Sequence, residues 1–253
     1  MKTSSRWLDW LGAITFVAVA AGLYLAFNYA PTEAKMGSIQ RIFYFHLGAD
    51  MVGLSAIIVA AVASALYLKS GALKWDRIAA SSMELGFVFG AIALATGMIW
   101  ARPIWGTWWT WDPRLTTFLI LWLFYIAYLM LRASARDDPG IARLAAVFTF
   151  VGVADVPFVI IAPRIWKGIS PVLLGSNEVQ EFTFNMTPEM VQTLIVSVSA
   201  VLLLYVYLLA QRVRLEELRA EVDAMHAEDY AEARAHRTLP RPSSELVETQ
   251  TST

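Results

Sequence analysis

Long apolar runs separated by short polar segments make up most of the chain. A bilayer core needs roughly 20 apolar residues when a helix crosses it, and six runs are near or above this length: residues 10–30, 45–68, 78–100, 115–131, 144–162 and 190–210. Backbone groups in lipid must be satisfied within each segment, so we expect every run to be helical. The pattern predicts an all-α polytopic membrane protein with six transmembrane helices.

The first run is too long for the apolar region of a cleavable signal peptide, so we expect it to remain as a membrane anchor. Lys and Arg are spread unevenly over the connecting segments: eleven lie on the same side as the N-terminus and six lie in the three loops on the other side. Cytoplasmic loops carry the excess of Lys and Arg. We therefore expect both termini in the cytoplasm and a membrane domain over residues 1–211.

Residues 212–253 hold 15 of the 41 charged residues and form a polar tail. Apolar residues spaced three and four apart predict an amphipathic cytoplasmic helix over residues 212–237: Leu215, Leu218, Val222 and Met225. The polar, proline-containing end after Leu239 predicts a disordered segment. The helix is either a solvated extension of the sixth run or a docking helix for a cytoplasmic partner.

The composition excludes two other classes of protein. The chain has no cysteine, which excludes a secreted disulfide scaffold. Its net charge of −1 excludes a basic nucleic-acid-binding protein. Only 16% of the residues are charged, against about 25% in ordinary soluble domains, so a lipid bilayer is the expected surrounding.

The outer loop between the third and fourth runs, residues 101–114, is rich in tryptophan. Four tryptophans lie within seven residues: Trp105, Trp108, Trp109 and Trp111. Tryptophans that anchor a helix at the membrane interface are fewer at each helix end, so this group indicates a platform of flat apolar faces for a planar ligand. Arg102 and Arg114 flank the platform and suit carboxylate groups on the edge of such a ligand.

Two positions set where this loop turns and where it ends. Gly106 allows a turn or a close backbone approach. Asp112 followed by Pro113 has the pattern of a helix N-cap and a first helical residue. The sequence leaves open whether Asp112 is a structural cap or a ligand-facing carboxylate.

His46 is the one histidine outside the tail, and it begins the second run on the same side as the tryptophan loop. An ionisable group in an apolar membrane segment is a functional candidate, and a neutral imidazole is a common axial ligand of haem iron. The aromatic platform, the flanking arginines and the imidazole together point to haem, with His46 as the iron ligand.

Three segments resemble a known family. Residues 105–116, WGTWWTWDPRLT, resemble the "WWD" signature of haem-handling proteins of cytochrome c maturation. The form is that of the CcmC family rather than of its larger relatives CcmF and CcsA. Residues 41–46, RIFYFH, resemble the RIxYxH segment that opens the second span in CcmC, and residues 151–157 are similar to its GVxNxP-like segment.

The resemblance implies a non-enzymatic factor that transiently holds haem b at the outer face of a prokaryotic cytoplasmic (inner) membrane. CcmC-like proteins present haem to the membrane-tethered chaperone CcmE, and they act with the ABC transporter CcmA–CcmB and the small membrane protein CcmD. The motifs carry over an axial ligand, His46, and a platform: Trp105, Gly106, Thr107, Trp108, Trp109, Trp111, Asp112, Pro113 and Arg114. Arg41, Arg102 and Arg164 are further candidates to pair with the haem propionates.

One departure from the family concerns the second iron ligand. The family usually has a histidine in the third outer loop, and here Ser170 stands near that position. Met186 is a candidate replacement, because a thioether can ligate haem iron. A vacant or water-filled position, a ligand from a partner and a loss of haem binding are the other interpretations.

Acidic residues inside the apolar runs need their own explanation. Asp50 follows His46 by one helical turn, and it either orients the imidazole or lies in the headgroup region. Glu84 either contacts a transporter partner or pairs with a cation near the start of its own run, Lys74 or Arg77.

Asp155 lies in the fifth run, two residues before Pro157, whose ring interrupts the helical hydrogen bonds. We expect the Asp155 carboxyl group to be protonated and to hydrogen-bond the loosened backbone, rather than to relay protons.

Two other functions are compatible with parts of the sequence. A haem lyase of the CcmF or CcsA type would attach haem to an apocytochrome, but six spans and one outer histidine are fewer than those relatives have. A haem ABC permease subunit would also have six spans. The chain carries no ATPase motif of its own, and its few polar membrane residues do not line one obvious path.

Overall fold

The structure, a computed structural model, describes residues 6–134, 138–165 and 186–238. Six helices in these residues are long and apolar enough to span a membrane, which confirms the all-α prediction. They are α1 (Arg6–Tyr24, continued by the π-helical turn Leu25–Tyr29), α2 (Ile42–Ser70, preceded by the 3-10 turn Ser38–Arg41), α3 (Leu73–Trp105), α4 (Pro113–Ser134), α5 (Pro139–Ile165) and α6 (Pro188–Thr238).

Glycine and proline mark most of the helix ends. α2 ends at Gly71 and α3 at Gly106, where the left-handed backbone (φ of 69° and 74°) turns the chain out of the helix. α4, α5 and α6 each begin with a proline, whose fixed φ suits the first helical position. Because these signals lie beyond the apolar runs, α2 and α3 are longer than the runs that predict them.

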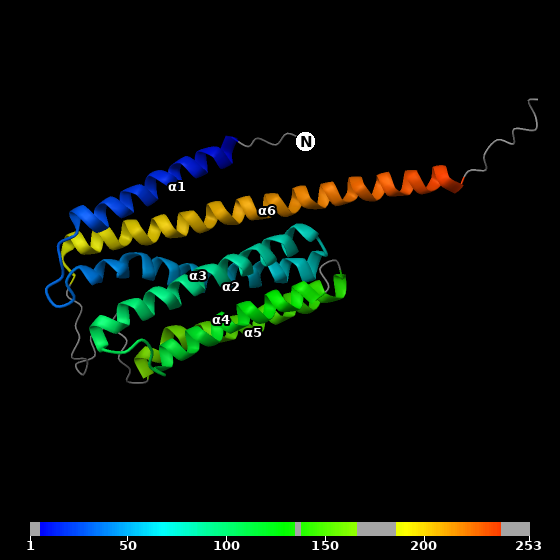
Figure 1. Ribbon diagram of the computed structural model, residues 1–253. Helices are drawn as coiled ribbons and strands as arrows, with labels where there is room; N and C mark the ends of the chain where they lie inside the picture. Colours follow the sequence, from blue (N-terminus) through cyan, green and yellow to red (C-terminus); the bar gives the residue numbers. More distant parts are fainter. Residues whose placement is uncertain (1–5, 135–137, 166–185, 239–253) are drawn as a thin grey trace, which may run out of the picture. The chain divides into compact units, whose positions relative to one another are not determined.

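The helices alternate in direction, so the α1–α2 and α3–α4 connections lie at the same end of the bundle (Figure 1). The α2–α3 hairpin lies between the α4–α5 pair and α6, and α1 lies against α6 (Figure 1). On the α6 side, the Tyr205 hydroxyl is 2.7 Å from the Ser82 hydroxyl of α3, which in turn donates a hydrogen bond to the Ala56 carbonyl of α2. These two hydrogen bonds connect α6, α3 and α2.

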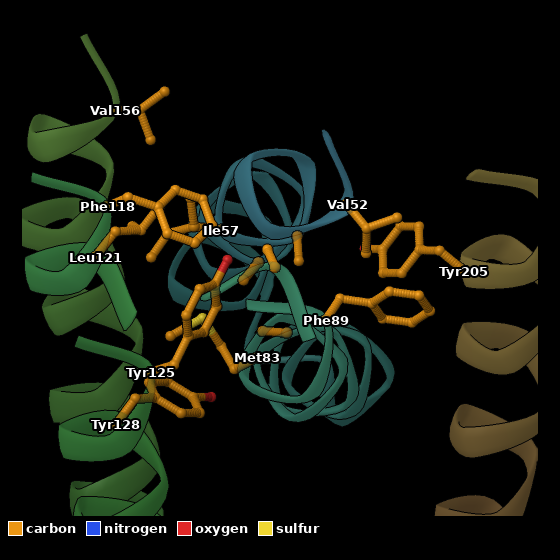
Figure 2. Close-up of a cluster of buried hydrophobic side chains, with 14 of the residues drawn as sticks. Val52, Ile57, Met83, Phe89, Phe118, Leu121, Tyr125, Tyr128, Val156 and Tyr205 are labelled. Carbon is orange, nitrogen blue, oxygen red and sulfur yellow. The ribbon is translucent and has the colours of Figure 1, made fainter. Parts of the chain in front are cut away.

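Small residues let the central helices approach closely. Alanines on one face of α2 are almost completely buried in the main apolar cluster: Ala49, Ala56, Ala60 and Ala63. Tyr125 of α4 packs in the same cluster (Figure 2), and its hydroxyl donates to the Gly53 carbonyl of α2. Close packing through small residues and hydrogen bonds between helices is the usual way that membrane helices associate.

Two ion pairs link α3 to neighbouring helices, one to α4 and one to α6. Asp76 of α3 forms two hydrogen bonds, of 3.0 and 2.8 Å, with Arg132 of α4. Glu84 of α3 forms two, of 2.5 and 3.0 Å, with Arg212 of α6. The cation that meets Glu84 thus comes from a distant helix rather than from the start of α3.

The chain divides into two compact units, Met1–Val213 and Arg214–Thr253. In the second unit α6 continues as a helix to Thr238. The apolar stripe predicted for this helix is exposed: Leu215, Leu218, Val222 and Met225. The segment after Leu239, for which we expect disorder, lies outside the described residues.

Candidate functional site

The first unit contains a hollow between α2, α3, the tryptophan loop and the start of α4, with about 720 Å³ of empty space when the part open to solvent is included. We call it the cavity. Most of its lining residues are apolar or aromatic, as is usual for small-molecule and cofactor sites. The lining residues are His46, Asp50, Ala93, Leu94, Gly97, Met98, Trp100, Ala101, Trp105, Thr107, Trp108, Trp109, Thr110, Arg114, Leu115 and Phe118.

His46 reaches the cavity from the first turns of α2, and only 14% of its side chain is exposed. Its Nδ1 lies 3.1 Å from the hydroxyl oxygen of Thr96 on α3. The ring also lies close to Gly97: a Cβ atom added there would meet the Cε1 atom of His46 at 3.0 Å. The imidazole is therefore held against α3 by a hydrogen bond and by direct packing.

Asp50 links His46 to Arg114. Arg114 lies in the first turn of α4, directly after the tryptophans of the loop. The Asp50 Oδ2 atom lies 3.6 Å from the His46 Nε2 and 3.4 Å from an Arg114 terminal nitrogen. All three side chains line the cavity. Of the two interpretations of Asp50, the structure thus favours the one that links it to the imidazole, and it adds a cation that the sequence did not pair with it.

The tryptophans of the loop divide into two groups. Trp105, Trp108 and Trp109 line the cavity, whereas Trp111 is 76% exposed and does not. Trp111 instead meets Trp109 edge to face, with ring centroids 5.8 Å apart. A further tryptophan, Trp100 of α3, lines the cavity and packs against Trp105 with centroids 5.6 Å apart. The platform therefore begins one helical turn earlier than the motif suggests.

The backbone of the loop is held by its own side chains. Gly106 ends α3, and its carbonyl accepts a hydrogen bond from the Arg102 side chain. The Thr107 hydroxyl donates to the Trp109 carbonyl over 2.9 Å. Asp112 is buried and accepts a hydrogen bond of 2.9 Å from the Arg114 backbone N–H, as an N-cap does at the start of α4.

Several predicted site residues lie away from the cavity. Arg102 is exposed and bonded to the loop backbone. Arg41 ends the turn before α2, where its guanidinium lies 5.8 Å from the centroid of the Phe27 ring. Met186 packs in an apolar cluster with Phe43 and Leu194. None of these three predicted residues lines the cavity.

The methionine that does line the cavity is Met98 of α3, which no sequence pattern singled out. Ser170 and the side chain of Arg164 lie outside the described residues.

Sequence reasoning also missed Thr96, Gly97 and Thr110. Thr110 lies inside the tryptophan motif, which was a usable signal. Thr96 and Gly97 precede the motif by several residues in an ordinary apolar helix, and their role depends on how α3 packs against α2.

The cavity wall holds polar groups that no described residue satisfies. The indole N–H groups of Trp100 and Trp109 and the Thr110 hydroxyl are shielded and have no hydrogen-bond partner among the described residues. Buried polar groups normally find partners, and these three are exceptions among the residues that line the cavity. The described part of the chain contains no group of three or more His, Cys, Asp or Glu side chains placed so that they could hold a metal ion. A single imidazole in an aromatic cavity suits a planar metal complex better than a bare metal ion.

The chain is similar to a well-defined set of proteins. The family model described as "Heme exporter protein C" (CcmC) matches residues 1–228. The "Heme exporter protein C" of Rhodobacter capsulatus is 33% identical over 217 residues, which cover 85% of this chain and 88% of the relative.

Other organisms also have proteins that are similar to this chain. The protein with the same name in Escherichia coli K12 is 31% identical over 208 residues, 82% of each chain. A ccmC-like mitochondrial protein of cytochrome c biosynthesis from Marchantia polymorpha is 29% identical over 167 residues, 66% of this chain and 71% of the relative.

Proposed function

The chain belongs to the CcmC family of haem exporter proteins, and on that premise we propose that it is a haem-binding factor of cytochrome c maturation. It holds haem b transiently in the cavity, at the outer face of a prokaryotic cytoplasmic membrane. It delivers this haem to a membrane-anchored chaperone of the CcmE type and works with the transporter CcmA–CcmB and with CcmD. In this role it performs no catalysis of its own.

The observation that carries the proposal is that one imidazole and one arginine face a hollow walled by tryptophans. His46 and Arg114 line the same cavity as Trp105, Trp108 and Trp109. Haem is flat and apolar, has carboxylates on one edge and carries an iron with axial positions. Each of these features has a counterpart among the lining residues.

Different residues of this chain contact different parts of the haem in this proposal. His46 ligates the iron, and the tryptophan faces cover the porphyrin plane. Arg114, already beside Asp50 at 3.4 Å, pairs with a propionate. Gly106 and Asp112 fix both ends of the loop, so the platform is preorganised before haem arrives.

In this proposal the second axial ligand is not a histidine of the cavity wall, because His46 is the one histidine among the lining residues. Among the described residues, Met98 is the one further side chain of the cavity with a ligating atom of the thioether type, and Met186 packs elsewhere. A position left to a weak ligand or to the chaperone suits a protein that must give its haem away.

An absorption spectrum of the haem-loaded protein tests the proposal. The full chain, purified in detergent and titrated with haem, should give a ligated-haem spectrum that His46→Ala abolishes or shifts. His226→Ala is the matched control, because His226 lies on the exposed tail helix, and it should behave as the wild type does. An identical spectrum for His46→Ala would overturn the assignment of the ligand.

The proposed orientation can be tested with introduced cysteines, because the chain has none. In spheroplasts, whose cytoplasmic membrane is intact, a membrane-impermeant maleimide should label Lys35→Cys in the α1–α2 connection. It should label Glu221→Cys in the tail only after the membrane is permeabilised. The reverse pattern would contradict an outer-face haem site.

A further inference from the structure

Thr96 of α3 contacts His46, the proposed iron ligand, at the Nδ1 side of the imidazole ring. Thr96 is absent from the tryptophan motif and does not line the cavity, yet its hydroxyl oxygen lies 3.1 Å from Nδ1 of His46. We propose that Thr96 is a positioning residue, whose hydroxyl accepts a hydrogen bond from the His46 Nδ1–H and thereby leaves the Nε2 lone pair free for iron. This inference rests on the proposed function of the cavity.

The direction of this hydrogen bond follows from the other contacts of Thr96. Its hydroxyl oxygen lies 2.7 Å from the Ile92 carbonyl and 3.2 Å from the Ala93 carbonyl, one helical turn earlier. A hydroxyl has one proton and two lone pairs, and carbonyl oxygens only accept. The proton of Thr96 is thus committed to its own helix, and the oxygen presents a lone pair to His46.

This assignment matters because a second acceptor lies on the other side of the ring. The Asp50 Oδ2 atom is 3.6 Å from Nε2, and a carboxylate there favours a proton on Nε2, which would block iron binding. Two features oppose a proton on Nε2. The contact between Thr96 and Nδ1 is shorter, and Arg114 lies 3.4 Å from the same carboxylate oxygen. Thr96 therefore decides which nitrogen of His46 carries the proton.

The residue after Thr96 completes the arrangement. Gly97 allows the imidazole to lie directly on α3, since even a Cβ atom would come within 3.0 Å of the His46 ring. Two consecutive residues of α3 thus fix both the depth and the rotation of the ring. Partners that orient a ligating histidine in this way commonly change metal affinity about 10- to 100-fold when they are removed.

The test compares haem affinity and reduction potential among variants of the full chain in detergent. Thr96→Ser and Thr96→Ala both lose the methyl group, so the difference between them reports on the hydroxyl alone. We expect Thr96→Ala to bind haem roughly 10-fold more weakly than Thr96→Ser. Its midpoint potential should be higher, because an imidazole without an acceptor on Nδ1 is a poorer donor to ferric iron.

Two controls separate positioning from general damage. Thr15 on α1 is buried and bonds to the carbonyl four residues earlier, as Thr96 does, so Thr15→Ala should leave both readouts unchanged. Thermal unfolding of the haem-free variants shows whether the fold is intact, and Thr96→Val, which keeps the volume, replaces Thr96→Ala if the latter does not fold.

The possible results distinguish two failures. If the wild type binds no haem, or if His46→Ala behaves as the wild type does, the proposed function fails. If haem binding depends on His46 but the Ser and Ala variants of Thr96 have equal affinity and potential, the function stands and the positioning role of Thr96 is wrong.

Discussion

Arg114 lies beside Asp50, with a guanidinium nitrogen 3.4 Å from a carboxylate oxygen, although 64 positions separate the two residues in the chain. Arg114 comes from the first turn of α4, and Asp50 comes from α2, one helical turn after His46. The pair closes one side of the cavity. It also keeps a cation in the cavity wall that the carboxylate of a ligand can reach.

We expect Arg114→Gln to weaken haem binding by roughly 10- to 100-fold. A charge-assisted hydrogen bond contributes about 1.5–3 kcal/mol, and about 1.4 kcal/mol corresponds to a factor of ten in affinity. Titration of the purified protein with haem, followed by absorbance, measures the change.

The matched control is Arg102→Gln. Arg102 also flanks the tryptophans in sequence, but its side chain bonds to the Gly106 carbonyl and does not line the cavity. Its affinity for haem should stay within a factor of about two of the wild type. Equal losses in the two variants would show that both arginines serve the ligand, or that neither acts through the cavity.

Gly97→Ala should disturb the imidazole without removing any polar group. The added methyl would lie 3.0 Å from the His46 ring, so the ring must shift by a few tenths of an ångström. Ligand positions are sensitive to such shifts, and we expect an altered haem spectrum with a folded apoprotein. Gly90→Ala is the control on the same helix, because its methyl would meet Trp122 instead. Similar spectra for Gly97→Ala and the wild type would mean that the ring has room to move.

Two ion pairs far from the cavity should differ in their effect on stability. The Asp76–Arg132 pair is nearly buried, with 11% and 18% of the side chains exposed, whereas Glu84 and Arg212 are 38% and 25% exposed. Removing one partner of a buried pair leaves an uncompensated charge and costs about 3–5 kcal/mol, while a partly exposed pair contributes up to about 1 kcal/mol.

Asp76→Asn should therefore lower the unfolding temperature clearly more than Glu84→Gln does. Thermal unfolding in a single detergent compares the two directly. Glu221→Gln on the exposed tail helix provides a variant that loses an acidic charge without an expected loss of stability. A larger effect at Glu84 than at Asp76 would indicate that the α3–α6 contact is a principal support of the bundle.

The sequence predicted the helices well because their signals are local. Apolar length defines the six spans, and Asp112 with Pro113 marks the start of α4 by a cap that the structure contains. The tryptophan motif likewise predicted five of the residues that line the cavity: Trp105, Thr107, Trp108, Trp109 and Arg114. These features depend on neighbours within a few positions along the chain.

The rest depended on packing between helices, which a single sequence does not encode visibly. Arg41, Arg102 and Arg114 look equivalent as cations near aromatic residues, yet only Arg114 lines the cavity. The difference arises because Gly106 turns the chain after α3 and α4 then brings Arg114 back toward α2. Thr96 was missed for the same reason: its partner is 50 positions away.

Asp155 on α5 provides the last test, because its Oδ2 atom is shielded and accepts no hydrogen bond from any described residue. The bond to the loosened backbone near Pro157 that we expected is therefore not made by this oxygen. A buried polar atom without a partner costs stability, and replacing it with an apolar group is neutral or favourable. Asp155→Leu should accordingly leave the unfolding temperature unchanged or raise it, with haem affinity unaltered. The opposite result, lost haem handling in a folded Asp155→Leu protein, would instead support a proton relay or a polar path through this helix.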